Sequence, residues 1–99
     1  MITIEQITAA LYQTCPAYPD EGLNGVPARP AAALILLAEA EDGLHLLLTK
    51  RAEHLRHHPG QVSLPGGKPE RGDVDPGATA RREAEEETGL RQHDMHHIG

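Results

Sequence analysis

The feature that most constrains this chain is a helix whose two ends are both marked in the sequence. Asp75 is a residue type that caps helix N-termini, and Pro76 follows at the first helical position, where a missing N–H does no harm. Gly89 stands at the other end, where glycine adopts the left-handed conformation that ends many helices. We therefore expect a helix of roughly three and a half turns between these marks.

Four glutamates crowd the last part of this helix, in the stretch REAEEETGL at residues 82–90. Glu83, Glu86 and Glu87 have i, i+3 and i+4 spacing, so they share one helix face, where each like-charged pair costs about 0.2–0.5 kcal/mol. One interpretation is an ordinary solvated helix face. The other is a cation site, because Mg²⁺ and Mn²⁺ bind carboxylate oxygens and keep open positions for water and phosphate.

Two arginines precede the acidic face. Arg81 and Arg82 stand four residues before glutamates, in the basic-first order that gives the weaker helical ion pairs. Glu85 points away from the acidic face and is free to pair with Arg81. Glu83 and Glu87 are left without a local partner, and this favours the cation interpretation.

The rest of the chain predicts a second helix and a hairpin. Thr3 and Gln6 form a capping-box pattern ahead of apolar residues at helical spacing, which predicts a helix over 4–13. A continuous apolar run at 31–38 predicts a buried strand. A Glu-Asp-Gly turn then leads to a second strand at 44–49, which completes the hairpin.

Proline and glycine mark the loops. Four prolines and two glycines between residues 16 and 30 predict a surface loop, and residues 64–67 predict a tight loop before the last helix. Gly66 and Gly67 would let the backbone approach an anionic ligand, although a plain turn is the commoner use of such a pair. Residues 94–99 predict the approach to a further strand.

Composition excludes several classes of protein. Fifteen Asp and Glu residues against nine Lys and Arg do not give the basic surface that binds nucleic acid. The apolar run at 31–38 is far shorter than the roughly 20 residues that span a membrane, and the single Cys15 allows no internal disulfide. We expect a cytoplasmic protein that binds neither nucleic acid nor membrane. Phe and Trp are absent, which predicts a thin core.

Gly67, Asp73 and the run at 82–90 resemble the Nudix box. That pattern is Gly, five residues, Glu, seven residues, and then Arg-Glu-apolar-any-Glu-Glu-any-Gly-apolar. The second half matches at every specified position. The first half differs in two ways, since Asp73 replaces Glu and eight residues rather than seven separate it from Arg82.

The stretch before the box is similar to the signature of the coenzyme A pyrophosphatases. Residues 47–67 read LLTKRAEHLRHHPGQVSLPGG. The signature is LLTxR, Ser or Ala, three residues, Arg, three residues, Gly, three residues and FPGG, and only Leu64 departs from it. A longer box that contains Asp is usual in this branch, so both departures from the general box agree with it.

The resemblance implies an α/β (α+β) fold, a Nudix-type α/β/α sandwich with a mixed sheet, of which residues 1–99 would be the N-terminal portion of a single domain. It implies hydrolysis, with Mg²⁺ or Mn²⁺, of the diphosphate of coenzyme A or its derivatives to 3′,5′-ADP and 4′-phosphopantetheine or its acyl form. The alternatives are a Nudix hydrolase of another nucleoside diphosphate derivative and an inactive part of such an enzyme. A core left incomplete would make the chain marginally stable or favour a homodimer.

The resemblance also assigns roles to residues. Glu83 and Glu87 would be metal ligands, and Glu86 a third ligand or the base that deprotonates the attacking water. Arg82 would orient the glutamates through charge-assisted hydrogen bonds. The substrate side would consist of backbone groups and guanidinium groups: Gly66, Gly67, Arg51 and Arg56.

Alternatives stay open for the arginines and for the histidines. Arg51 and Arg56 could instead form ion pairs with a nearby acid such as Glu53 or Glu70. The pattern HxxHH, which occurs at 54–58 and at 93–97, raises a structural zinc site as an alternative to surface or substrate-contacting histidines.

Overall fold

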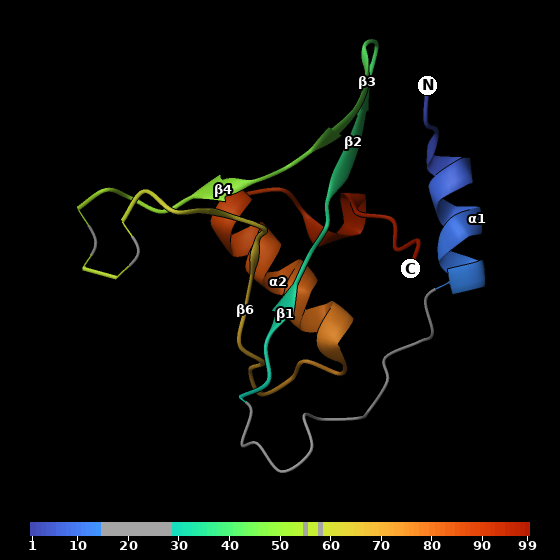
Figure 1. Cartoon of the computed structure of the whole chain (residues 1–99). Helices are drawn as coiled ribbons and strands as arrows, with labels where there is room; N and C mark the ends of the chain where they lie inside the picture. The colour runs from blue at the N-terminus through green and yellow to red at the C-terminus, as the bar shows by residue number, and fades with distance from the viewer. Residues whose placement is uncertain (15–28, 55, 58) are drawn as a thin grey trace.

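The computed structural model describes residues 1–14, 29–54, 56–57 and 59–99 (Figure 1). The elements in chain order are α1 (Ile4–Thr14), β1 (Ala32–Ala33), β2 (Leu37–Ala40), β3 (Gly43–Leu46), β4 (Thr49–Lys50), β5 (Val62–Ser63), β6 (Gly66–Gly67), α2 (Pro76–Thr88) and the short 3₁₀ helix η1 (Gln92–Asp94). The described residues form both helices and strands, so the predicted α+β class is confirmed. No helix in the described ranges is long and apolar enough to cross a bilayer.

Both predicted helices are present with the predicted ends. In α1, Thr3 Oγ1 accepts from the Gln6 N–H at 3.2 Å and Gln6 Oε1 accepts from the Thr3 N–H at 2.9 Å, which is the reciprocal capping box. In α2, the Asp75 side chain accepts from the Ala78 N–H at 2.7 Å. Gly89 ends α2 at φ 80°, and its N–H donates to Glu85 O at 2.8 Å.

The strands form three antiparallel pairs, β1 with β6, β2 with β3 and β4 with β5. The predicted hairpin is confirmed, because β2 and β3 pair from Leu37 opposite Leu46 to Ala40 opposite Gly43. Its second strand, predicted over 44–49, is wrong in extent, since β3 ends at Leu46 and Thr49 belongs to β4. The predicted single buried strand at 31–38 is wrong. The run divides into β1 and the start of β2, and Ile35 between them is 67% exposed.

The tight loop predicted at 64–67 is also wrong, because Gly66 and Gly67 form strand β6. Gly67 pairs with Ala32 and Gly66 with Ala33. The reason is steric. A Cβ on Gly66 would lie 2.7 Å from the Cα of Ala33, so only glycine allows the two strands to come this close.

The core lies between α2 and the pair β1–β6. Figure 1 shows α2 packed along β1 and β6, and contacts between these elements are the main contacts of α2. The buried residues of the described ranges are Pro65 and four residues of α2, namely Gly77, Thr79, Ala80 and Ala84. The predicted thin core is confirmed, since small side chains fill it.

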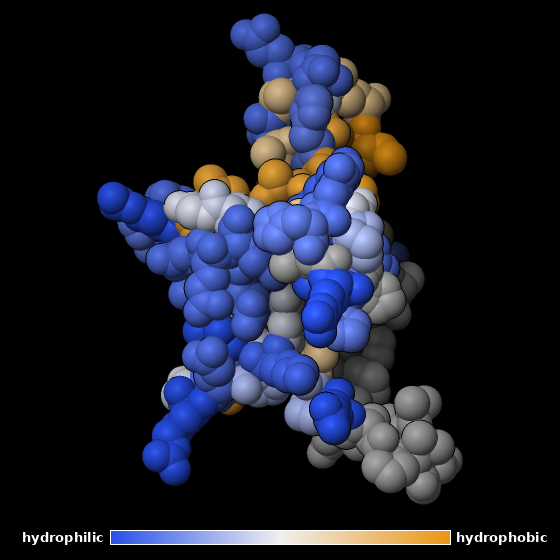
Figure 2. Space-filling view, turned by 90° about the vertical axis from the view of Figure 1, so that its left-hand side faces the viewer, coloured by the Kyte–Doolittle hydropathy of each residue, from blue (hydrophilic) through white to orange (hydrophobic). Residues whose placement is uncertain are grey.

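The N-terminal helix and the hairpin stand outside this core. Figure 1 shows α1 beside the β2–β3 hairpin and the C-terminal end, and Gly99 lies against Leu11 of α1. Figure 2 shows apolar atoms gathered in the upper part of the displayed face, above a largely hydrophilic body. Tyr12 of α1 and Leu46 of β3 are 85% and 49% exposed, so this region is packed more loosely than the core.

After α2 the chain forms η1, and residues 95–99, most of the predicted approach to a further strand, form neither helix nor strand. The Met95 N–H donates to Gln92 O at 3.0 Å to close this turn. The loop predicted at 16–30 lies for the most part outside the described residues, as does Cys15.

Candidate active site

The guanidinium of Arg82 is the centre of the polar structure on α2. Its Nε donates to Asp73 Oδ1 at 3.2 Å and its Nη2 donates to Asp73 Oδ2 at 3.1 Å, which is a two-pronged contact with one carboxylate. The same Nη2 donates to the carbonyl of Lys68 at 2.9 Å. One side chain thus ties the loop after β6 to the helix.

The third nitrogen of the Arg82 guanidinium, Nη1, contacts the acidic face of α2. Nη1 donates to Glu83 Oε1 at 3.1 Å and to the two oxygens of Glu86 at 3.2 and 3.3 Å, and it lies 3.5 Å from Glu70 Oε1. The Arg82 side chain is only 17% exposed. Two of the three glutamates that share the face are therefore held by a guanidinium that is itself fixed.

Asp73 is the acid that fixes Arg82. Its Oδ2 also accepts from the Glu70 N–H at 2.8 Å and from Thr79 Oγ1 at 2.9 Å, and its side chain is 9% exposed. Hydrogen bonding from Arg82, followed by that from the Glu70 N–H, outweighs burial and lowers the pKa of Asp73 to about 2. The same contact with Asp73 raises the pKa of Arg82.

The strand β6 closes the site beside Glu83. A Cβ on Gly67 would lie 2.5 Å from Cδ of Glu83 and 2.6 Å from its Oε1, so the Glu83 carboxylate rests directly on the Gly67 backbone. The Glu83 side chain is 19% exposed. The cradle exists only because residue 67 has no side chain.

The sequence that forms this geometry matches the model of a known protein family. The model of the NUDIX domain matches residues 27–99, which is most of the chain. The chain belongs to the Nudix family. The match includes the helix, the loop and the glycine strand described above.

Named relatives agree with the assignment. The chain is 61% identical over 61 residues to "Nudix hydrolase 15, mitochondrial" and 56% identical over 73 residues to "Nudix hydrolase 22, chloroplastic", both from Arabidopsis thaliana. It is 52% identical over 54 residues to "Uncharacterized Nudix hydrolase NudL" from Yersinia pestis (strain Pestoides F). These matches cover 61%, 71% and 54% of this chain, but only 21%, 24% and 27% of the relatives' own lengths.

The acidic face of this Nudix domain suits a hard divalent cation in the chemistry of its donors. Glu83, Glu86 and Glu87 offer carboxylate oxygens, the ligand type that Mg²⁺ and Mn²⁺ prefer, and Glu86 and Glu87 are exposed. Glu83 rests in a cradle that a Cβ would fill. Within the described ranges, no three carboxylate, imidazole or thiol side chains come together closely enough to hold a metal ion. Of the zinc alternative, this covers the histidines at 93–97, whereas His58 of the first set lies outside the described residues.

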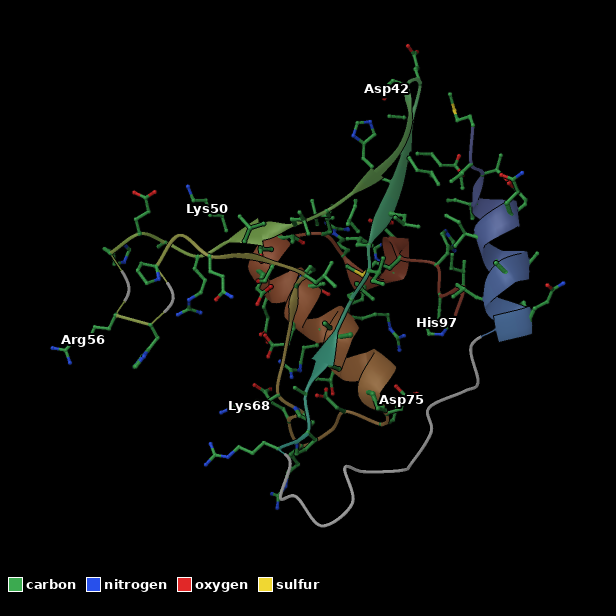
Figure 3. All side chains as sticks on the ribbon, in the orientation of Figure 1. Asp42, Lys50, Arg56, Lys68, Asp75 and His97 are labelled. Atoms are coloured by element: carbon green, nitrogen blue, oxygen red, sulfur yellow. The ribbon has the colours of Figure 1, made fainter. Side chains whose placement is uncertain are left out.

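The two arginines predicted on the substrate side are not gathered at the glutamates. Arg51 Nε donates to the carbonyl of His57 at 3.0 Å, and its backbone N–H donates to Gln61 O at 2.8 Å. Figure 3 shows Arg56 far to the side of α2, beyond β4. The local acids use other partners, since Glu53 pairs with Lys50 and Glu70 with Arg82.

The pairing of Arg81 with Glu85 is wrong. Glu85 Oε2 accepts from the Gln92 N–H at 3.1 Å and so connects α2 to η1. No ion pair joins Glu85 to Arg81 in the part of the chain that the structure describes.

Sequence reasoning missed two groups in this network, Thr79 and the carbonyl of Lys68. Thr79 precedes Arg82 by three residues, so helical spacing places both on one face, and this spacing was the available signal. No signal marks Lys68, because a backbone carbonyl is the same at every position.

Proposed function

We propose that this Nudix domain carries the metal-binding half of a pyrophosphohydrolase that acts on nucleoside diphosphate derivatives. The observation that carries the proposal is that one nitrogen of Arg82 holds the carboxylates of both Glu83, which rests on Gly67, and Glu86. Membership of the Nudix family supports the reaction class.

Glu83 and Glu87 would hold Mg²⁺ or Mn²⁺, with Glu86 as a third ligand or as the base. A bound cation would neutralise charge on the diphosphate oxygens and lower the pKa of a water molecule. If Glu86 is the base, one of its oxygens takes the proton from the attacking water. Arg82 keeps that side chain oriented, since it bonds both oxygens of Glu86 while Asp73 fixes its other edge.

We propose coenzyme A or one of its derivatives as the substrate, with 3′,5′-ADP and 4′-phosphopantetheine as products. The similarity of residues 47–67 to the coenzyme A signature supports this choice. Arg51 and Arg56 would pair with substrate phosphates, for which a planar guanidinium is well shaped. These arginines would have to approach the glutamates when substrate binds.

A second candidate is hydrolysis of a different nucleoside diphosphate derivative. Leu64 stands where the coenzyme A signature has Phe, and this one departure favours the alternative. The metal site and the attack by water are the same for both candidates.

The test is turnover by the 99-residue chain with Mg²⁺ or Mn²⁺, followed by mass analysis of the products. Coenzyme A, ADP-ribose and a dinucleotide polyphosphate would be compared as substrates, with full-length Nudix hydrolase 15 assayed in parallel. We expect coenzyme A to be cleaved between its two phosphates. Preference for ADP-ribose or the polyphosphate would move the assignment to the second candidate, and no turnover of any substrate would support an inactive chain.

Glu87→Gln tests the metal-ligand role. We expect metal-dependent turnover to fall by more than about 100-fold, since partners outside the ligand set already cost about 10- to 100-fold. Glu85→Gln on the same helix is the matched control and should leave turnover unchanged, because Glu85 contacts η1. Equal activity of Glu87→Gln and the unsubstituted protein would refute the ligand role.

A further inference from the structure

The hydroxyl of Thr79 differs from those of two other helical threonines, Thr8 and Thr88. Thr8 Oγ1 donates to Ile4 O at 2.8 Å and Thr88 Oγ1 donates to Ala84 O at 2.6 Å, which are the usual bonds to the carbonyl four residues earlier. Thr79 Oγ1 instead donates to Oδ2 of Asp73 at 2.9 Å, outside its own helix. The Thr79 hydroxyl therefore bonds the carboxylate of Asp73 in the loop and not the backbone carbonyl four residues earlier.

Thr79 is also the most buried polar side chain of the molecule's described part, with 1% of its surface exposed. A buried hydroxyl needs a partner, and an ionised carboxylate offers only acceptors, so the proton of this bond belongs to Thr79. Because the pKa of Asp73 is about 2, that carboxylate is ionised near neutral pH. The direction of the hydrogen bond is thereby fixed.

The position of Thr79 on α2 connects it to the acidic face. Thr79 lies one turn before Arg82 and Glu83, and Glu86 lies one turn further on, so all four share one side of the helix. Asp73 receives Thr79 on one oxygen and Arg82 on both. A rotation of the Asp73 carboxylate would therefore turn the Arg82 fork and the glutamates that it holds.

We infer that Thr79 is a positioning residue, whose buried hydroxyl fixes the Asp73 carboxylate so that Arg82 presents Glu83 and Glu86 in one orientation. The chain of contacts runs from Thr79 Oγ1 to Asp73, then to the guanidinium, and from Nη1 to the two glutamates. The effect on metal binding rests on the proposed function. The effect on Arg82 does not.

The test uses Thr79→Val, which keeps the shape and removes the hydroxyl, and Thr79→Ser, which keeps the hydroxyl. Thr88→Val is the matched control, because it loses a hydroxyl bonded within the same helix. The first measurement is the Nε–Hε resonance of Arg82 and its exchange with water. We expect Thr79→Val to shift this resonance and speed its exchange, while Thr79→Ser and Thr88→Val leave both near those of the unsubstituted chain.

The second measurement is the affinity for Mn²⁺ alone, followed by its paramagnetic signal. We expect Thr79→Val to weaken binding about tenfold, the lower end of the loss for outer partners of a metal site, with recovery in Thr79→Ser. If the unsubstituted chain does not bind Mn²⁺, the proposed function fails, and the Arg82 resonance still decides the role of Thr79.

An unchanged Arg82 resonance in Thr79→Val would overturn the inference, and so would a Thr79→Ser variant that behaves like Thr79→Val. If Thr79→Val does not fold, the unsubstituted chain supplies the decision. Its Thr79 hydroxyl proton should then give a slowly exchanging resonance at neutral pH, and the absence of that resonance would overturn the inference.

Discussion

The two helices of this protein are built to the same local rules but held in place differently. Each begins with a side-chain cap, at Thr3 for α1 and at Asp75 for α2. In α1, the Gln6 and Thr8 side chains bond groups three and four residues away, whereas Arg82 of α2 bonds groups nine and fourteen residues away, at Asp73 and Lys68. These side-chain bonds of α1 are local, and those of Arg82 are long-range.

Burial follows the same division. Four residues of α2 are buried, and none of residues 4–13 of α1 is. Small side chains bring α2 close to β1 and β6, and this closeness puts the Glu83 carboxylate on Gly67. Both helices follow the same local sequence rules, so those rules alone do not make α2 a candidate site. The fixed groups that contact α2 make the difference.

The largest effect should follow removal of the Arg82 guanidinium. Arg82→Met would leave the carboxylates of Asp73 and Glu83 and the carbonyl of Lys68 without their shared donor, and the two carboxylates are mostly shielded from water. We expect the fall in Tm to exceed that caused by a substitution at Gly67 or at either helix cap. We also expect Mn²⁺ affinity to fall by about 10- to 100-fold, measured by titration calorimetry.

Arg82→Lys separates charge from geometry in that experiment. Lysine keeps a positive charge but cannot contact Asp73 and the glutamates at once with a planar fork. We expect it to recover little of either loss. A full recovery would show that charge alone, and not the fork, holds the acidic face.

A methyl group at residue 67 should give the next effect. In Gly67→Ala the new Cβ would lie 2.5–2.8 Å from the Glu83 carboxylate, so β6 and α2 must move apart. Overpacking of this kind costs about 1–3 kcal/mol, measured as the free energy of unfolding in urea. In a Glu83→Ala background the same change should cost much less, and an equal cost in both backgrounds would place the strain elsewhere.

Acid should weaken the α2 region through Asp73. The pKa of Asp73 is lowered from 3.8 to about 2 in the folded protein, so its contribution to stability is complete above 3.8 and is lost as the pH falls towards about 2. Asp73→Asn removes that contribution at every pH. The difference in Tm between the two proteins should therefore be largest above pH 3.8 and shrink towards pH 2, and a constant difference would contradict the ionic role of Asp73.

These contrasts also explain how far the sequence could predict the structure. The ends of both helices and the β2–β3 hairpin follow from neighbouring residues, such as the Asp75 cap and the Gly89 end, and each is confirmed. The strand at Gly66–Gly67 was missed, because its partners Ala32 and Ala33 lie more than thirty residues earlier and glycine gives no strand preference.

The site divides in the same way. The placement of the three glutamates on one face follows from helical spacing, and so does the bond from Arg82 to Glu86. The expectation that Glu83 has no local partner is wrong, because Arg82 also bonds its neighbour Glu83. The fixed position of Arg82 depends on Asp73, which lies in the turn before α2 and contacts the helix through Arg82. Eight residues separate Asp73 from Arg82, one more than in the general Nudix box, and this spacing gave no indication of the contact between them.

The smallest effect should come from the α1 cap, and it tests the comparison directly. Removing a cap costs a helix about 1 kcal/mol, so Thr3→Ala and Asp75→Ala make equivalent changes at α1 and α2. Since α2 carries the core, we expect Asp75→Ala to lower the free energy of global unfolding by about that amount. In Thr3→Ala we expect faster amide exchange within α1 and a global change below about 0.5 kcal/mol, because a loosely held helix opens without the rest. Equal global losses from the two substitutions would mean that α1 and α2 unfold as one unit, and that the burial seen in α2 does not make it the more firmly held helix.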